Sequence, residues 1–162
     1  MVSQDSQEGK IATGNQQLTR EKAVDISPME VFCSYSHEDE ALRDKLEKYL
    51  SPLKRQRYIT TWYDRRILAG QKWADEIDHH LNTAQIILLL ISPDFLASED
   101  CSTVEVKRAI ERDERGEARV IPIILRPIYW QEEPFGKLQA LPKDAKPVID
   151  WPILDDALFD VA

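Results

Sequence analysis

The chain has 162 residues, 43% of them hydrophobic and 31% charged, so a single domain with an ordinary core is expected. The net charge of −8 argues against nucleic acid or an anionic membrane as the main partner. The only cysteines, Cys33 and Cys101, provide neither a disulfide framework nor a zinc spacing and suit a reducing compartment. Because no secretory signal opens the chain, a cytoplasmic protein is expected.

The amino-terminal part predicts a leader, a strand and a helix. Residues 1–27 are polar and aperiodic, which predicts a disordered leader or linker before a domain at 28–162. Residues 29–35 (MEVFCSY) form the first predicted strand. Ser36 has the position of an N-cap, and Asp39 resembles the other half of a capping box. The next helix is predicted from apolar residues at helical spacing: Leu42, Leu46, Tyr49 and Leu53.

A second strand is predicted at 58–63 (YITTWY), followed by a loop over 64–71 in which Gly70 is the permissive residue. One apolar face then marks a helix: Trp73, Ile77 and Leu81. His79 and His80 lie near two acids on this helix. The spacing favours a solvated helix face over a metal site, so no metal is expected.

The most apolar run of the chain, Ile86–Ile91, has the length of a strand that is buried on both faces of a parallel sheet. Ser92-Pro93-Asp94 stops the run, and a helix at about 99–113 carries Glu105. Open α/β sheets bind their ligands near the carboxyl ends of their strands. The run and its following helix are therefore the centre of the predicted site.

The remaining elements complete an alternation of strands and helices. A fourth strand is predicted at 118–125, where Pro122 favours an edge or a bulge. An irregular segment, 126–143, precedes a short fifth strand at 146–151 (KPVIDW) and an amphipathic helix at 153–161. This order predicts a doubly wound parallel sheet with right-handed crossovers.

Several common chemistries are excluded by missing motifs. The five glycines cannot form a G-x-G-x-x-G or a Walker A loop, and neither G-x-S-x-G nor H-E-x-x-H occurs. Rossmann-type hydride transfer, P-loop phosphoryl transfer and α/β-hydrolase chemistry are therefore not expected.

Glu105 lies on a helical stripe with apolar Cys101 and Ala109 and with Arg108. Two interpretations are open. The acid can lie at the edge of the buried face in an ion pair with Arg108, or it can be held at the mouth of the sheet for chemistry. The pattern alone favours the ion pair.

A series of motifs between residues 29 and 151 has a recognisable order and spacing: FCSYSHEDE, WYDRRILAGQKW, ISPDFLAS, CSTVE, RVIPIILRP and FGKLQALP. Together they resemble the TIR (Toll/interleukin-1 receptor) domain of the bacterial kind. The resemblance implies an α/β, flavodoxin-like fold with a five-stranded parallel sheet of order 2-1-3-4-5 and helices on both faces. In that fold the strand with Pro122 is internal.

The resemblance also implies an activity, because many relatives cleave NAD+ at the nicotinamide–ribose bond with an essential glutamate. Glu105 matches that residue, and Cys101 stands where relatives often have an aromatic residue. Segments at the strand ends are then expected to line the substrate site: Ser34, Tyr35, Asp64, Arg65, Arg66, Gly70, Trp73 and Cys101. The arginines are equally explained as surface charge and Ser34 as a small strand-end residue. The helical spacing of Trp73 with Ile77 and Leu81 favours a core or loop anchor over a base-stacking platform.

The expected chemistry needs NAD+ as substrate and no other cofactor. Nicotinamide leaves without an acid catalyst, so a single anion, assigned to Glu105, suffices to stabilise the oxocarbenium-like ribose. The products are nicotinamide and linear or cyclic ADP-ribose. The resemblance further implies activation by self-association with other TIR domains, and a role in bacterial immunity. The alternative is a non-enzymatic adaptor that acts through TIR–TIR contacts. A response-regulator receiver fits poorly, because Ser92-Pro93 follows the third strand.

Overall fold

The computed structural model describes residues 27–63, 73–98 and 105–162. Four parallel strands pair in the order β2-β1-β3-β4, which confirms the predicted order for these strands. Their bounds are β1 Met29–Ser34, β2 Ile59–Trp62, β3 Ile86–Ile91 and β4 Arg119–Ile124. The leader predicted at the amino terminus falls almost wholly on residues 1–26, which lie outside the described part.

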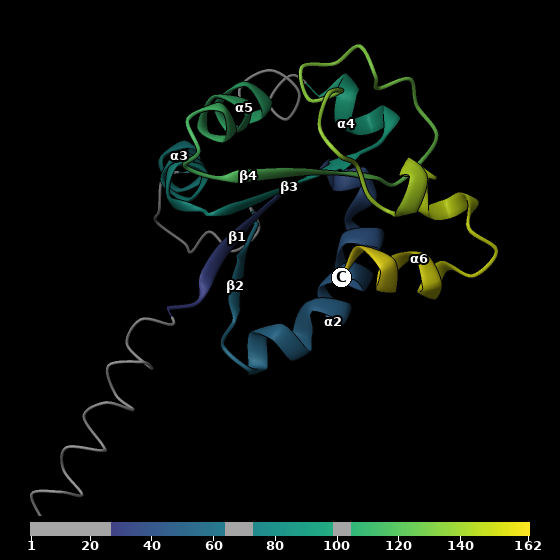
Figure 1. The fold of residues 1–162 in the computed structure, drawn as a ribbon, viewed down its shortest axis with the longest axis horizontal. Helices are drawn as coiled ribbons and strands as arrows, with labels where there is room; N and C mark the ends of the chain where they lie inside the picture. The colour runs from purple at the N-terminus through teal and green to yellow at the C-terminus, as the bar shows by residue number, and fades with distance from the viewer. Residues whose placement is uncertain (1–26, 64–72, 99–104) are drawn as a thin grey trace, which may run out of the picture.

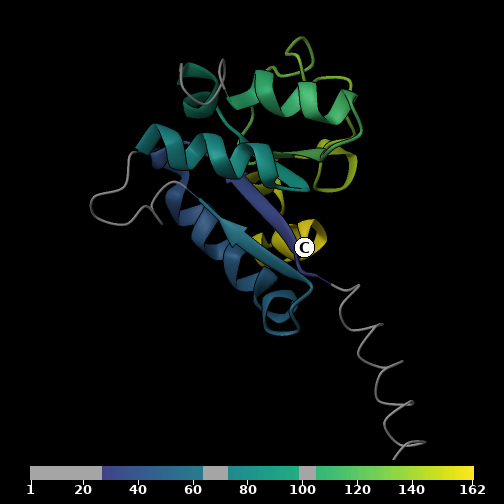
Figure 2. The ribbon, with the colours of Figure 1, turned by 90° about the vertical axis from the view of Figure 1, so that its left-hand side faces the viewer.

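Helices cover both faces of the sheet, as Figure 1 shows. One face carries α3 (Trp73–Thr83) and α5 (Val106–Glu114), and the other carries α2 (Glu40–Arg55) and α6 (Leu154–Val161). Figure 2 shows the same separation after a quarter turn. The predicted α/β, flavodoxin-like fold with helices on both faces is confirmed. A short helix, α4 (Pro93–Ala97), follows β3 directly.

Alternation along the strands divides the core into two layers. In β3, Ile87, Leu89 and Ile91 pack toward α3 and α5, while Leu88 and Leu90 pack toward α2 and α6. All five are buried, as the continuous apolar run predicts for a strand covered on both faces. Burial of each such side chain contributes about 1.5–3 kcal/mol, so β3 is the rigid centre of the sheet.

The predicted fifth strand at 146–151 is wrong, because this segment contains a 3-10 helix, η5 (Val148–Asp150). Pro147 has no N–H to give to a ladder, and its carbonyl accepts from the N–H of Asp150 at 2.9 Å instead. The place beside β4 is taken by one residue, Leu141, in an isolated parallel bridge to Ile123. Another 3-10 turn, η4 (Lys143–Ala145), lies between that bridge and η5.

Pro122 is tolerated because its missing donor would face away from β3. The N–H groups of Arg119 and Leu125 bond β3-side carbonyls at 2.9 Å, so the even-numbered residues between them face outward. Of these, Val120 donates to the Asp113 carboxylate at 2.9 Å and Ile124 donates to the Leu141 carbonyl at 2.9 Å. The outer side of β4 therefore offers few donors to another strand, as expected of a protected edge.

Candidate functional site

Two of the residues predicted for the site, Ser34 and Glu105, are brought into direct contact. Ser34 is the last residue of β1, and Glu105 immediately precedes α5. The Ser34 hydroxyl donates a hydrogen bond to Oε2 of Glu105. Ser34 is 2% exposed and Glu105 is 8% exposed, so the carboxylate is held inside the protein at the carboxyl end of the sheet. This is the position at which open α/β sheets bind ligands.

The local sequence explains why the two side chains meet. Alternation along β1 puts Phe32 and Ser34 on the face that α5 covers. Val106 and Ala109 are fully buried against that face and fix the start of α5 above it. Glu105 directly precedes Val106, so the burial of Val106 places Glu105 near the same face of the sheet. Glutamate is almost never buried unless it is paired, so its burial marks a special environment.

The ion pair between Glu105 and Arg108, which the pattern alone favoured, is wrong. Arg108 donates to the side-chain oxygen of Asn82 at 2.8 Å and lies 3.9 Å from Glu111. Its side chain is 46% exposed and lies on the solvent side of α5. Arg108 is therefore not the partner that accounts for the buried charge of Glu105.

Tyr35 lies on the opposite face of the sheet from Ser34, because neighbouring residues of a strand point in opposite directions. Its ring packs against Tyr63, and the Arg43 guanidinium lies 5.4 Å from the centre of the Tyr35 ring and 3.6 Å from that of Tyr63. Burial alone would lower the pKa of Arg43, but the bond with Tyr63 and nearby charges raise it above its ordinary value. The structure does not bring Tyr35 together with the Ser34–Glu105 pair, and its role in substrate binding stays a prediction.

Most of the other predicted substrate residues lie outside the described part of the chain: Asp64, Arg65, Arg66, Gly70 and Cys101. Trp73 is the first residue of α3. Their roles remain predictions.

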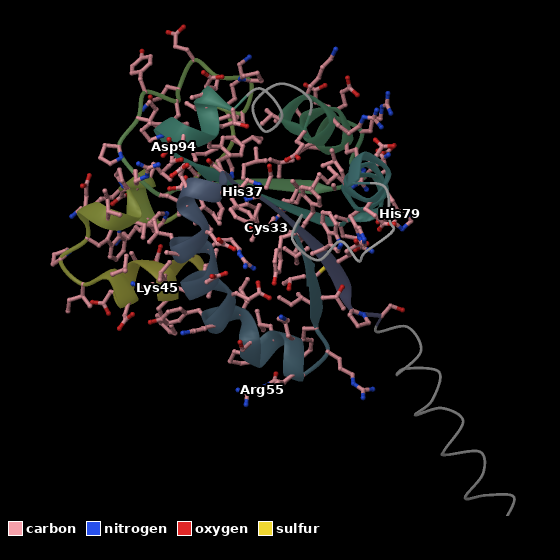
Figure 3. All side chains as sticks on the ribbon, turned by 180° about the vertical axis from the view of Figure 1, so that it is seen from behind. Cys33, His37, Lys45, Arg55, His79 and Asp94 are labelled. Atoms are coloured by element: carbon pink, nitrogen blue, oxygen red, sulfur yellow. The ribbon has the colours of Figure 1, made fainter. Side chains whose placement is uncertain are left out.

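A polar cluster at the same end of the sheet was not anticipated for the site. The buried carboxylate of Asp39 accepts from the Ser92 hydroxyl and from Nε of Arg126 at 3.0 Å. Nη2 of Arg126 also donates to Asp94. We call these four residues, Asp39, Ser92, Asp94 and Arg126, the strand-end clamp. Figure 3 shows Asp94 at the same end of the sheet as His37, which lies in η1 (His37–Asp39).

The clamp corrects the predicted capping box. Ser36 does act as an N-cap, but of η1, where it accepts from the N–H of Glu38 at 3.4 Å. Asp39 precedes α2 without capping it, because its carboxylate is turned inward to a guanidinium and a hydroxyl. The hydrogen bond to Asp94 raises the pKa of Arg126, and the one to Asp39 raises it further. The predicted topology could have revealed the clamp, because its residues follow β1, β3 and β4 and therefore lie at the carboxyl edge of the parallel sheet.

His80 is placed by contacts within the fold. Its Nδ1 lies 2.5 Å from Glu30, and its ring stacks on Trp62 with 4.3 Å between ring centres. Among the residues that the structure describes, no group of three or more His, Cys, Asp and Glu side chains is arranged to hold a metal ion. Nor is any described helix long and apolar enough to cross a lipid bilayer.

A groove of about 660 Å³ opens at the opposite end of the sheet, near the first residues of β4. Its charged lining consists of Asp113, Glu117 and Arg119. Two acids against one base do not favour a dinucleotide with a negatively charged pyrophosphate. The groove is therefore a poorer candidate for such a ligand than the carboxyl end of the sheet.

A doubly wound sheet with a buried glutamate at the start of the helix after β3 and α4 is the arrangement expected of a TIR domain. The model of the TIR-domain family matches residues 31–151, and the chain belongs to that family. It is 58% identical over 132 residues to the uncharacterized protein y4lF of Sinorhizobium fredii (strain NBRC 101917 / NGR234). That match covers 82% of this chain and 41% of the relative, so the chain spans less than half of the relative's length.

A solved structure with the same fold is similar to this chain at low sequence identity. The TIR domain of the Toll-related receptor TRR-2 from Hydra magnipapillata aligns with a TM-score of 0.51 and 22% identity, over 68% of this chain and 81% of that one. The TIR domains of the activated Roq1 resistosome, which directly recognizes the pathogen effector XopQ, align with a TM-score of 0.48 and 21% identity. That alignment covers 59% of this chain and 56% of the Roq1 chain.

Proposed function

We propose that the chain is a TIR-domain NAD+ glycohydrolase that cleaves the nicotinamide–ribose bond and uses Glu105 as its essential anion. The observation that carries the proposal is the buried Glu105 carboxylate, held by Ser34 at the carboxyl end of the sheet. An acid at such a position is retained against a desolvation penalty, which favours a chemical role over a surface role.

The chemistry requires a fixed negative charge and little else. As the glycosidic bond breaks, nicotinamide leaves with the bonding electron pair as a neutral molecule. Positive charge develops on the ribose ring, and a carboxylate that is already desolvated and oriented stabilises this charge more strongly than water does. Water then attacks the anomeric carbon and releases a proton to solvent to give ADP-ribose, or an adenine nitrogen attacks to give the cyclic product.

The hydrogen bond from Ser34 serves this role by orientation. It fixes one carboxylate oxygen of Glu105, so that the carboxylate need not reorganise as charge develops. Hydrogen bonds from the ribose hydroxyls to the same carboxylate would place the substrate. The proposed substrate is NAD+, with no further cofactor and no metal.

We further propose that activity depends on self-association of TIR domains in the cytoplasm, as part of bacterial immunity. The second loop, with Asp64, Arg65, Arg66 and Gly70, is the segment proposed to meet a neighbouring copy and the pyrophosphate of NAD+. Cys101 supplies no aromatic ring at the position four residues before Glu105, where relatives often have one. That substitution favours the second candidate function, a non-enzymatic adaptor that acts through TIR–TIR contacts.

Nicotinamide release by the purified protein tests the proposal. The protein is incubated with NAD+ over a wide range of protein concentrations, with and without a crowding agent, and nicotinamide is quantified by chromatography. We expect the rate per protein molecule to rise steeply with concentration. A rate per molecule that is independent of concentration argues against self-association, and no product at high concentration favours the adaptor.

A further inference from the structure

We propose that the strand-end clamp is a positioning device that sets the alignment of Ser34 with Glu105. This inference rests on the proposed function, and it assigns a task to four residues outside the proposed chemistry. Asp39 is the centre of the clamp, because its carboxylate joins the hydroxyl of Ser92 to the guanidinium of Arg126. Its side chain is 2% exposed, so its bond with Ser92 is buried, while its bond with Arg126 is partly buried.

The clamp holds the strand that carries Ser34. In the sheet, Ser34 pairs in register with Leu89 of β3. The chain leaves β1 through η1 to reach Asp39, and it leaves β3 directly into Ser92. The bond between Asp39 and Ser92 therefore fastens the exits of β1 and β3 to each other beyond Ser34. Relative movement of these two exits would displace the Ser34 hydroxyl.

The clamp also holds the segment that leads to Glu105. Ser92 caps α4 by accepting from the N–H of Phe95 at 3.1 Å, and Asp94 in the first turn of α4 accepts from Arg126. Phe95 is fully buried and belongs to the same hydrophobic cluster as Val106, the residue after Glu105. A shift of α4 would thus be transmitted through this cluster to the start of α5.

The hydrogen-bond geometry of the clamp suits a positioning role better than a purely stabilising one. Arg126 has a planar guanidinium whose donors point in fixed directions, and it bonds one carboxylate from η1 and one from α4. Apolar side chains in the same place would contribute to stability but would allow η1 and α4 to slide. The ion pairs of Arg126 are only partly buried, and pairs open to solvent contribute little net stability, so geometric definition is the stronger reason for this arrangement.

Two clamp variants and one matched control test the inference. Asp39→Asn keeps the shape of the side chain and removes its charge. Arg126→Lys keeps the charge and removes the fork that reaches both carboxylates. Glu47→Gln is the control, because Glu47 is a partly buried carboxylate that bonds Lys54 at 2.5 Å and Thr61 at 2.6 Å between α2 and β2. Unfolding temperature, kcat and KM for NAD+ are measured for each, well below the unfolding transition.

We expect both clamp variants to lower kcat by about ten- to hundredfold while KM changes by less than about threefold, since misalignment affects the chemical step. Glu47→Gln should lower the unfolding temperature and leave kcat near that of the wild type. An active wild type whose clamp variants keep their kcat overturns the inference. Crystal structures of the variants decide independently of activity: the Ser34–Glu105 hydrogen bond should be lost or displaced, and an unchanged bond contradicts the clamp. A wild type without nicotinamide release contradicts the proposed function alone.

Discussion

Replacing Ser34 with alanine isolates the contact on which the candidate site depends. The substitution removes the only hydroxyl of a residue that is 2% exposed and takes one donor from the Glu105 carboxylate, which is 8% exposed. A hydrogen bond to a charged group contributes about 1.5–3 kcal/mol. Water cannot easily replace the lost donor at this degree of burial, so we expect the free energy of unfolding to fall by an amount in that range.

The effect on catalysis follows from the same contact. If the hydrogen bond acts fully on the orientation of Glu105, about 1.5–3 kcal/mol corresponds to a fall in kcat of roughly ten- to hundredfold. KM should change little, because the hydroxyl acts on the carboxylate. A rise in KM at constant kcat would instead mean that Ser34 contacts NAD+ directly.

Denaturant unfolding followed by circular dichroism measures the change in the free energy of unfolding, and nicotinamide release measures the change in kcat. Ser51→Ala is the matched control, because the Ser51 hydroxyl donates only to the Glu47 carbonyl, one turn earlier in α2, at 3.1 Å. That variant should change the free energy of unfolding by less than about 0.5 kcal/mol. If Ser34→Ala behaves like Ser51→Ala in both assays, the account of the site is refuted.

Three further predictions concern the scaffold. Gly136→Ala should destabilise by about 1–3 kcal/mol in denaturant unfolding, because a Cβ there would lie 2.1 Å from the Gln131 carbonyl oxygen; an unchanged midpoint contradicts this close approach. Arg57→Gly should stabilise by about 0.5–1 kcal/mol, since Arg57 follows the C-cap residue of α2 with a φ of 62°; a lower unfolding temperature would be the wrong sign. Burial alone would raise the pKa of Glu47, but hydrogen bonds from Lys54 and Thr61 lower it below its ordinary value. Its stabilisation is therefore complete above the unfolded pKa of about 4.3 and is lost as pH falls through the folded value. Glu47→Gln should flatten the acid side of the stability–pH curve, and a curve parallel to that of the wild type would exclude this contribution.

Much of the fold could be predicted because it depends on local patterns. The apolar run of β3 and the helical spacing in α2, α3 and α6 identified those elements and the faces they bury. The prediction of a fifth strand was wrong. The segment KPVIDW has strand-forming residues, but its second residue, Pro147, precedes a 3-10 turn at Val148–Asp150. Composition could not show that Leu141 would take the place beside β4.

The candidate site was predictable in part. The position of Glu105 after β3 and of Ser34 at the end of β1 placed both at the carboxyl edge, and the fold joins them. Tyr35 could have been separated from them by the two-residue period of a strand alone. The role of Asp39 was hidden because a capping box and a buried clamp look the same in sequence. The contacts of Asp39 with Ser92 and Arg126, both far along the chain, distinguish them.

The central claim is that Glu105 supplies the charge for cleavage of NAD+, and Glu105→Gln tests it most directly. Glutamine keeps the size of the side chain and can still accept from Ser34, but it carries no negative charge. Glu111→Gln, on the same helix with a side chain that is 42% exposed, is the matched control. At a protein concentration at which the wild type releases nicotinamide, the account predicts that Glu105→Gln lowers the rate by at least about a hundredfold while Glu111→Gln retains it. Nicotinamide release by Glu105→Gln at the wild-type rate would contradict the account.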